Sequence, residues 1–109
     1  MESRARLYSI VIPVYRSEAC LATTVRELLA FFETRSKIEV ILVNDGSPDD
    51  VQRVIDELCA ADTRVRGLSL GKNLGQHRAT LQGFCETRGD VVVTIDDEGP
   101  GLPDDQLEA

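Results

Sequence analysis

Apolar residues are concentrated in four short segments of the chain, and these segments are rich in β-branched side chains. They cover residues 7–14, 38–43, 65–70 and 91–95, and the first two contain almost no polar residue. A short continuous apolar run predicts a strand that is buried on both faces, which is typical of a parallel sheet. The sequence therefore predicts four strands, of which the third is the weakest.

The segments between these strands carry apolar residues three or four positions apart, which is the spacing of one helix face. The first two predicted helices have the apolar sets Leu21, Val25, Leu28, Leu29, Phe32 and Val51, Val54, Ile55, Leu58. A third helix is predicted from about Gln76 to Thr87. Ser17 and Ser47 are the candidate N-caps of the first two helices, and Pro48 suits the first turn of the second.

The resulting order is β-α-β-α-β-α-β, which predicts an α/β fold of three layers, with a mostly parallel, Rossmann-like sheet between helices. No linker or internal repeat divides residues 1–109, so we interpret them as part of one domain. The last strand and an acidic loop reach the end of the chain, and we therefore expect an incomplete domain. Ligands of such sheets bind beyond the carboxyl ends of the strands.

Charge and cysteine content narrow the range of partners. The chain has 12 Lys and Arg against 19 Asp and Glu, a net charge of −7, which argues against non-specific nucleic-acid binding and against a polybasic membrane anchor. Three cysteines without a C-x-x-C pair, together with the lone His77, do not make a zinc site. Neither a signal peptide nor an apolar run of roughly 20 residues is present, so we expect reduced thiols in a cytoplasmic protein.

Polar residues follow each predicted strand, in the segments 13–16, 44–47, 71–75 and 96–98. The last segment, Asp96-Asp97-Glu98, gives the sharpest signal, because adjacent carboxylates repel one another and favour a counter-cation. Mg²⁺ and Mn²⁺ prefer oxygen ligands and commonly combine one or two carboxylates with phosphate oxygens. The segment is therefore either a site for such a metal or a solvated acidic loop.

The other candidate residues each have a structural and a functional interpretation. Asp45 either forms a helix-capping turn with Gly46 or accepts hydrogen bonds from a nucleobase. Tyr15 either stacks on a base or packs as a core aromatic residue. Lys72 and Arg78 are either the cations nearest to a phosphate site or ordinary surface charges.

Four segments taken together resemble the glycosyltransferases of family 2. Residues 9–15 (SIVIPVY), 43–49 (VNDGSPD), 73–79 (NLGQHRA) and 93–98 (VTIDDE) are similar to four motifs of that family in order and spacing. The resemblance covers residues 8 to about 105 and is greatest to the polyprenyl-phosphate branch. It implies a GT-A fold and the transfer of a sugar, with inversion, from a UDP- or GDP-linked donor.

The resemblance also implies which residues bind the nucleobase. Pro13 and Tyr15 would border the base, Glu18 would lie nearby, and Asp45 would bind the base itself. Arg16 departs from the family pattern, which commonly has asparagine at this position.

For the donor's diphosphate, the resemblance points to the acidic segment. Asp96 and Asp97 would contact the donor, while Asp96 and Glu98 would ligate Mg²⁺ or Mn²⁺ in a motif similar to D-x-D. The acceptor would be a lipid phosphate, and the whole protein would act at the cytoplasmic face of the membrane. The general base is expected beyond Ala109.

A receiver-like regulatory module without enzymatic activity is the alternative, because it also carries acidic residues at strand ends. Its acids follow the first strand and its phospho-acceptor Asp follows the third, whereas here those strands end in residues 13–16 and 71–73. The glycine patterns of dinucleotide-binding folds and P-loops are absent. We therefore prefer the enzyme, and we expect the isolated chain to be inactive and its exposed sheet edge to favour self-association.

Overall fold

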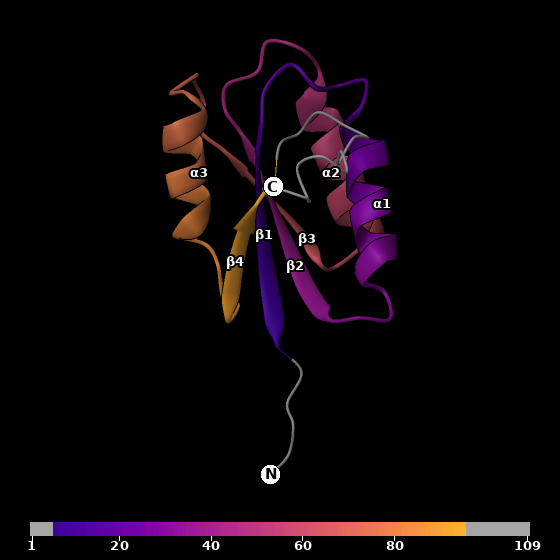
Figure 1. Ribbon diagram of the computed structural model, residues 1–109. Coiled ribbons are helices and arrows are strands. Elements are labelled where there is room, and N and C mark those ends of the chain that lie inside the picture. The colour runs from indigo at the N-terminus through magenta and orange to yellow at the C-terminus, as the bar shows by residue number, and fades with distance from the viewer. Residues whose placement is uncertain (1–5, 96–109) are drawn as a thin grey trace, which may run out of the picture.

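The computed structural model describes residues 6–95, and its strands and helices alternate in the predicted order (Figure 1). The elements are β1 (Leu7–Val14), α1 (Leu21–Phe32), β2 (Lys37–Asn44), α2 (Val51–Ala61), β3 (Val65–Ser69), α3 (Gln76–Phe84) and β4 (Val91–Thr94). The four strands of this part of the chain form one parallel sheet in the order β3-β2-β1-β4. The α/β fold predicted from the sequence is confirmed.

β1 lies inside the sheet and pairs on both sides, so that Ile10 is opposite Val40 of β2 and Val93 of β4. Because the strands are parallel, all their carboxyl ends reach the same edge of the sheet, which is the upper edge in Figure 1. We call this edge, with the loops that follow the strands there, the carboxyl edge, and the opposite one the amino edge. The described loops of the carboxyl edge are residues 15–20, 45–50 and 70–75.

The two faces of the sheet are covered unequally, with α1 and α2 on one face and α3 on the other (Figure 1). The main core lies between the sheet and α1 and α2, and on β1 it takes the alternate residues Ile10, Ile12 and Val14. The smaller core under α3 consists of Val11, Ile41, Val43 and Ala79. A Cβ atom on Gly83 would lie 2.4 Å from Cγ1 of Val11. The missing side chain at Gly83 therefore lets α3 pack directly on β1.

Both predicted N-caps are wrong. α1 follows Cys20 and α2 follows Asp50, and neither of these residues caps its helix with the side chain. The carbonyl of Ser17 accepts backbone hydrogen bonds from Cys20 and Leu21, which makes a turn ahead of the helix. The hydroxyl of Ser47 is bonded to a neighbouring loop instead. Ser17 thus forms a backbone turn that leads into α1, whereas the Ser47 side chain joins the second loop to the first.

A buried carboxylate connects the strands near the amino edge. Glu39 of β2 accepts hydrogen bonds from Oγ of Ser9 on β1 (2.5 Å), from Nη2 of Arg66 on β3 (3.0 Å) and from the backbone N–H of Arg88 (2.6 Å). Burial alone would raise the pKa of Glu39, but these bonds and the charge of Arg66 outweigh it and hold the pKa below its usual value of 4.5. Glu39 thereby bonds the segment between α3 and β4 to the sheet.

Two further features concern residues 6–95 as a whole. None of the helices in this range is long and apolar enough to cross a bilayer. No disulfide links Cys20, Cys59 and Cys85.

Candidate functional site

Asp45, the first residue after β2, bonds the second loop of the carboxyl edge to the third. Its Oδ1 accepts the backbone N–H of Leu74 (2.7 Å), and its Oδ2 accepts the N–H of Gly75 and Nδ2 of Asn73 (both 3.0 Å). The same Nδ2 of Asn73 also donates to the backbone carbonyl of Asp45 (3.0 Å). Only 2% of Asp45 is exposed. The structure thus shows that Asp45 organises the loop before α3, whereas its contact with a base stays a prediction.

Gly46 allows these two loops to approach each other at the backbone. Its φ is +65°, and a Cβ atom there would lie 2.2 Å from the backbone N of Asn73 and 2.2 Å from the carbonyl carbon of Lys72. Both the left-handed conformation and the lack of space therefore require glycine. The close approach could not be derived from the sequence, because the contact joins segments 26 or more residues apart.

Ser47 connects the second loop to the first. Its Oγ accepts the backbone N–H of Arg16 (2.7 Å) and donates to Oδ1 of Asp49 (2.6 Å). The three consecutive residues Asp45, Gly46 and Ser47 thus contact both neighbouring loops, Asp45 and Gly46 on one side and Ser47 on the other. Each residue of the D-G-S sequence therefore has its own part in holding the three loops together.

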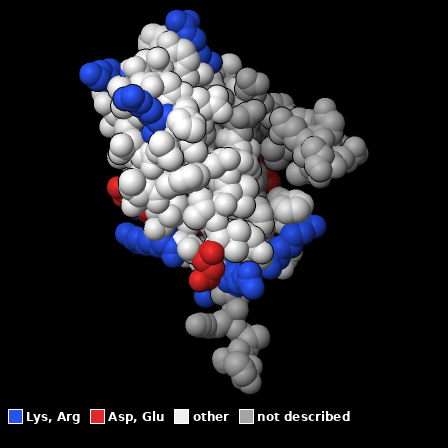
Figure 2. Space-filling view, turned by 60° about the vertical axis from the view of Figure 1, so that its left-hand side comes forward, with Lys and Arg blue, Asp and Glu red and all other residues white. Residues whose placement is uncertain are grey.

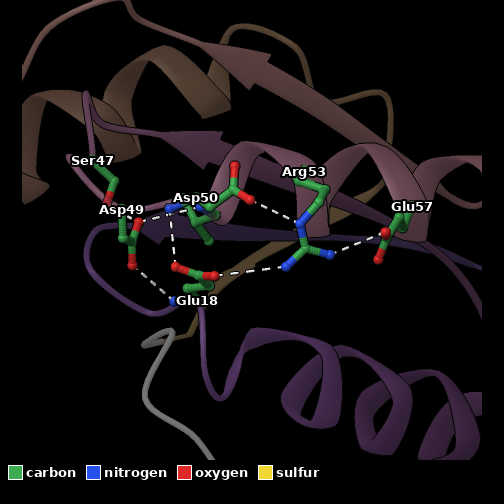
Figure 3. Close-up of polar contacts among 7 residues, drawn as sticks. Glu18, Ser47, Asp49, Asp50, Arg53 and Glu57 are labelled. Carbon is green, nitrogen blue, oxygen red and sulfur yellow. Dashed lines mark hydrogen bonds and ion pairs between the residues drawn. The ribbon is translucent and has the colours of Figure 1, made fainter.

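Glu18 strengthens the connection between the first and second loops (Figure 3). Its backbone N–H donates to Oδ2 of Asp49 (3.0 Å), and its own Oε1 accepts the backbone N–H of Asp50 (3.0 Å). Arg53 of α2 then lies 3.6 Å from Oε2 of Glu18 and forms closer ion pairs with Asp50 (2.8 Å) and Glu57 (3.0 Å). The predicted donor residue Glu18 is therefore engaged in joining loops.

Asp49 is ionised in this arrangement more readily than a free aspartate. Burial would raise the pKa of its carboxyl group, but hydrogen bonds from Ser47 and from the backbone of Glu18 and Val51 outweigh burial and lower the pKa. The carboxylate thus accepts hydrogen bonds from both loops.

The residues that follow β1 expose an aromatic ring and a cation at the carboxyl edge. Pro13 is buried within β1, whereas 38% of Tyr15 is exposed, so Tyr15 is not a core aromatic residue. The guanidinium carbon of Arg16 lies 5.3 Å from the centroid of the Tyr15 ring, within the range of a cation–π contact. Arg16 has a φ of +58°, a left-handed conformation. Sequence reasoning does not predict this strain, since arginine is not a turn residue.

The remaining candidate residues lie on the surface or outside the described part. Lys72, His77 and Arg78 are exposed, and Figure 2 shows basic side chains at the two ends of the face that α3 covers, with few charges between them. Within residues 6–95, no group of three or more His, Cys, Asp or Glu side chains could hold a metal ion. Asp96, Asp97 and Glu98 lie outside the described residues, so the predicted metal ligands stay a prediction.

Comparison with known proteins relates the chain to sugar transferases. It is 38% identical over 99 residues to the undecaprenyl-phosphate 4-deoxy-4-formamido-L-arabinose transferase of Shewanella sediminis, an alignment that covers 89% of this chain and 30% of the relative. The enzyme of the same name from Pseudomonas aeruginosa PAO1 is 38% identical over 101 residues, covering 91% of this chain and 30% of the relative. The chain thus spans about three-tenths of the length of these curated relatives.

The fold is also found in solved structures. Staphylococcus aureus TarS 1–349 in complex with UDP-GlcNAc superposes with a TM-score of 0.71 and 19% identity, over 83% of this chain and 26% of that one. At this identity the likeness concerns the fold alone. None of the comparisons supports a receiver-like regulatory module. The family model described as "Glycosyl transferase family 2" matches residues 9–104, which is most of the sequence, and the chain therefore belongs to glycosyltransferase family 2.

Proposed function

We propose that this chain is the donor-binding part of a glycosyltransferase that moves a sugar from a nucleotide-diphosphate sugar to a polyprenyl phosphate at the cytoplasmic face of a membrane. The observation that carries the proposal is the carboxyl edge, where Asp45, Gly46 and Ser47 bind three loops into one surface. Ligands of open α/β sheets bind at such an edge. The names of the relatives supply the class of acceptor.

The hydrogen bonds that Asp45 already accepts favour uracil over guanine as the base of the donor. A carboxylate has about four acceptor positions, and three N–H groups already occupy both positions on Oδ2 and one on Oδ1. One acceptor position is thus left, which matches the single imide N–H of uracil better than the two adjacent N–H donors of guanine. Because only 2% of Asp45 is exposed, we expect the loop at 70–75 to shift slightly when the base binds. Pro13 and Tyr15 would border the base, and Glu18 would hold their loop.

Titration of Asp45 variants with UDP, GDP and CDP tests this proposal. Hydrogen bonds to a charged group are worth roughly 1.5–3 kcal/mol, so Asp45→Ala is expected to weaken UDP binding about 10- to 150-fold and to reduce the preference for UDP. Asp45→Asn is expected to be intermediate, because an amide still accepts a hydrogen bond. Glu39→Gln is the control, since Glu39 lies near the other edge. An unchanged base preference in Asp45→Ala would contradict a contact with the base.

The divalent metal is proposed for the segment that follows β4. The N–H of Ile95 donates to the carbonyl of Val11 (3.1 Å), so β4 remains attached to β1 up to the residue before Asp96. The acidic segment follows directly in the sequence, and its oxygen donors suit Mg²⁺ or Mn²⁺. Asp96 and Glu98 would hold the ion, Asp97 would lie beside the donor, and a bound ion would neutralise charge on the diphosphate.

Calorimetry tests the metal proposal with nucleotide binding as its readout. Replacing both Asp96 and Glu98 with alanine is expected to abolish the dependence of UDP affinity on Mn²⁺ and to leave the circular dichroism spectrum unchanged. If the double variant binds UDP with the same Mn²⁺ dependence as the wild type, the ligands lie elsewhere.

Sugar transfer needs more than donor binding. Because the chain spans about three-tenths of its curated relatives, we expect the 109 residues to bind donor and not to transfer sugar to undecaprenyl phosphate. Transfer by this chain alone, at a rate above spontaneous donor hydrolysis, would show that the catalytic base and acceptor site lie within it.

A further inference from the structure

Arg16 has a backbone conformation that an arginine adopts at a cost. Among residues 6–95 it is the one non-glycine residue with a positive φ, at +58°, while the other positive φ values belong to glycines. Left-handed backbone brings Cβ close to the following carbonyl oxygen in every residue except glycine. In this conformation the Arg16 N–H donates a hydrogen bond to Oγ of Ser47, at 2.7 Å. Glycine or asparagine would adopt this conformation more readily, so the arginine side chain itself needs an explanation.

The side chain of Arg16 is exposed, lies over the ring of Tyr15 and is hydrogen-bonded to that side chain. It forms no salt bridge with a carboxylate of residues 6–95. Arg53 gives the contrast, because its guanidinium is shared between three carboxylates. Asp49, whose charge acts on Arg16 from the second loop, already accepts hydrogen bonds from Ser47 and Glu18. The positive charge of Arg16 is therefore available to an anion.

Arg16 lies at the carboxyl edge, where we propose that the diphosphate of the donor binds. It follows β1, which pairs with β4 as far as Val11 opposite Thr94, and the acidic segment begins two residues after Thr94. The chain carries a net charge of −7, so a local cation would help to offset its repulsion of a diphosphate. A guanidinium presents its N–H donors in a planar fork that matches phosphate oxygens.

We propose that Arg16 is a further donor-binding residue, which contacts the diphosphate of the nucleotide sugar from the loop after β1. This inference rests on the proposed function. It explains why an arginine occupies a position where its backbone is strained, since the residue serves binding rather than stability.

The variant Arg16→Asn tests the proposal, because asparagine tolerates the left-handed conformation. We expect it to be more stable than the wild type toward urea, and to bind UDP in the presence of Mg²⁺ roughly tenfold or more weakly. Its affinity for uridine, followed by NMR titration, is expected to be unchanged, since uridine has no phosphate. Arg53→Gln is the matched control, with UDP affinity as in the wild type.

The outcomes separate this inference from the proposed function. Equal UDP affinity in Arg16→Asn and the wild type overturns the role of Arg16 and leaves the donor site intact. An equal loss of UDP and uridine affinity also overturns it, because the effect is then not on phosphate. A wild-type chain that binds neither UDP nor GDP overturns the proposed function, and the role of Arg16 with it.

Discussion

Two carboxylates, one on β2 and one directly after it, differ in what surrounds them. Glu39 lies near the start of β2 and Asp45 follows its end, and each accepts backbone N–H groups from a segment that flanks α3. Glu39 receives the N–H of Arg88 after the helix, and Asp45 receives those of Leu74 and Gly75 before it. α3 is thus bonded to β2 at both ends, in addition to its packing on the sheet.

The difference between the two carboxylates lies in their charge balance. Glu39 is paired with the guanidinium of Arg66 at 3.0 Å, whereas Asp45 has only neutral N–H partners and no ion pair within residues 6–95. A paired charge completes a structural contact, while an unpaired one retains attraction for polar groups of a ligand. We therefore interpret the contacts of Glu39 as a structural joint, and the lack of an ion pair at Asp45 supports our proposal that the carboxyl edge binds the donor.

The largest expected effect concerns the loop contact beside Asp45. We expect Gly46→Ala to destabilise the chain by about 3 kcal/mol, because its Cβ would overlap the backbone of Lys72 and Asn73. Gly71→Ala is the matched control, since Gly71 also has a positive φ but a Cβ atom there would meet nothing within 4 Å. It is expected to lose about 1 kcal/mol. If urea denaturation shows the same loss of stability in Gly46→Ala and Gly71→Ala, the second and third loops can move apart at Gly46 without cost.

Removing each carboxylate tests the comparison directly. We expect Asp45→Ala and Glu39→Ala each to lose about 2 kcal/mol of stability, because buried N–H groups lose their acceptors. UDP affinity is expected to fall in Asp45→Ala and to stay near the wild-type value in Glu39→Ala at temperatures where both variants are folded. If calorimetry shows the same loss in both variants, the two edges do not differ in function.

A smaller effect on the stability of the fold is expected when the pH is lowered. The pKa of Glu39 is lower in the folded chain than its usual 4.5, so the unfolded state binds more protons between these two values. The contribution of Glu39 to stability is therefore complete above about pH 4.5 and is lost as the pH falls through the folded pKa. Glu39→Gln is expected to show a shallower decline of stability below pH 4.5 than the wild type in urea titrations. If the stability of Glu39→Gln and of the wild type declines equally as the pH falls, the Glu39 carboxylate is not held ionised by its contacts.

The smallest expected effect comes from the exposed ion pairs of Arg53. The side chain is 52% exposed, and its partners Glu18, Asp50 and Glu57 are also partly in solvent, so water and salt screen the attraction. Arg53→Gln is expected to lower the melting temperature slightly at low salt and not at all at high salt. A large, salt-independent loss would indicate that Arg53, rather than the backbone contacts of Glu18, joins the first two loops.

The strands and the sheet type were predictable because their signals are local. A run such as residues 38–43 has no polar face, and only a sheet covered on both sides buries it fully. The wrong caps at Ser17 and Ser47 show the limit of local reasoning, since each residue has a turn-forming side chain but neither starts a helix. The roles of Glu39, Asp45 and Asn73 depend on contacts over 27 to 49 residues, which spacing alone does not specify.

The strand order has a consequence for the sequence of events during folding. β1 is synthesised first, yet one of its sides remains unpaired until β4 is available, and the bond between Leu7 and Asp90 closes 83 residues of chain. β2 follows after one short helix and can pair much earlier. Closing long loops is slow, because entropy is lost before contacts form. Substitutions between β1 and β2 are thus expected to slow folding, whereas those in β4 mainly accelerate unfolding.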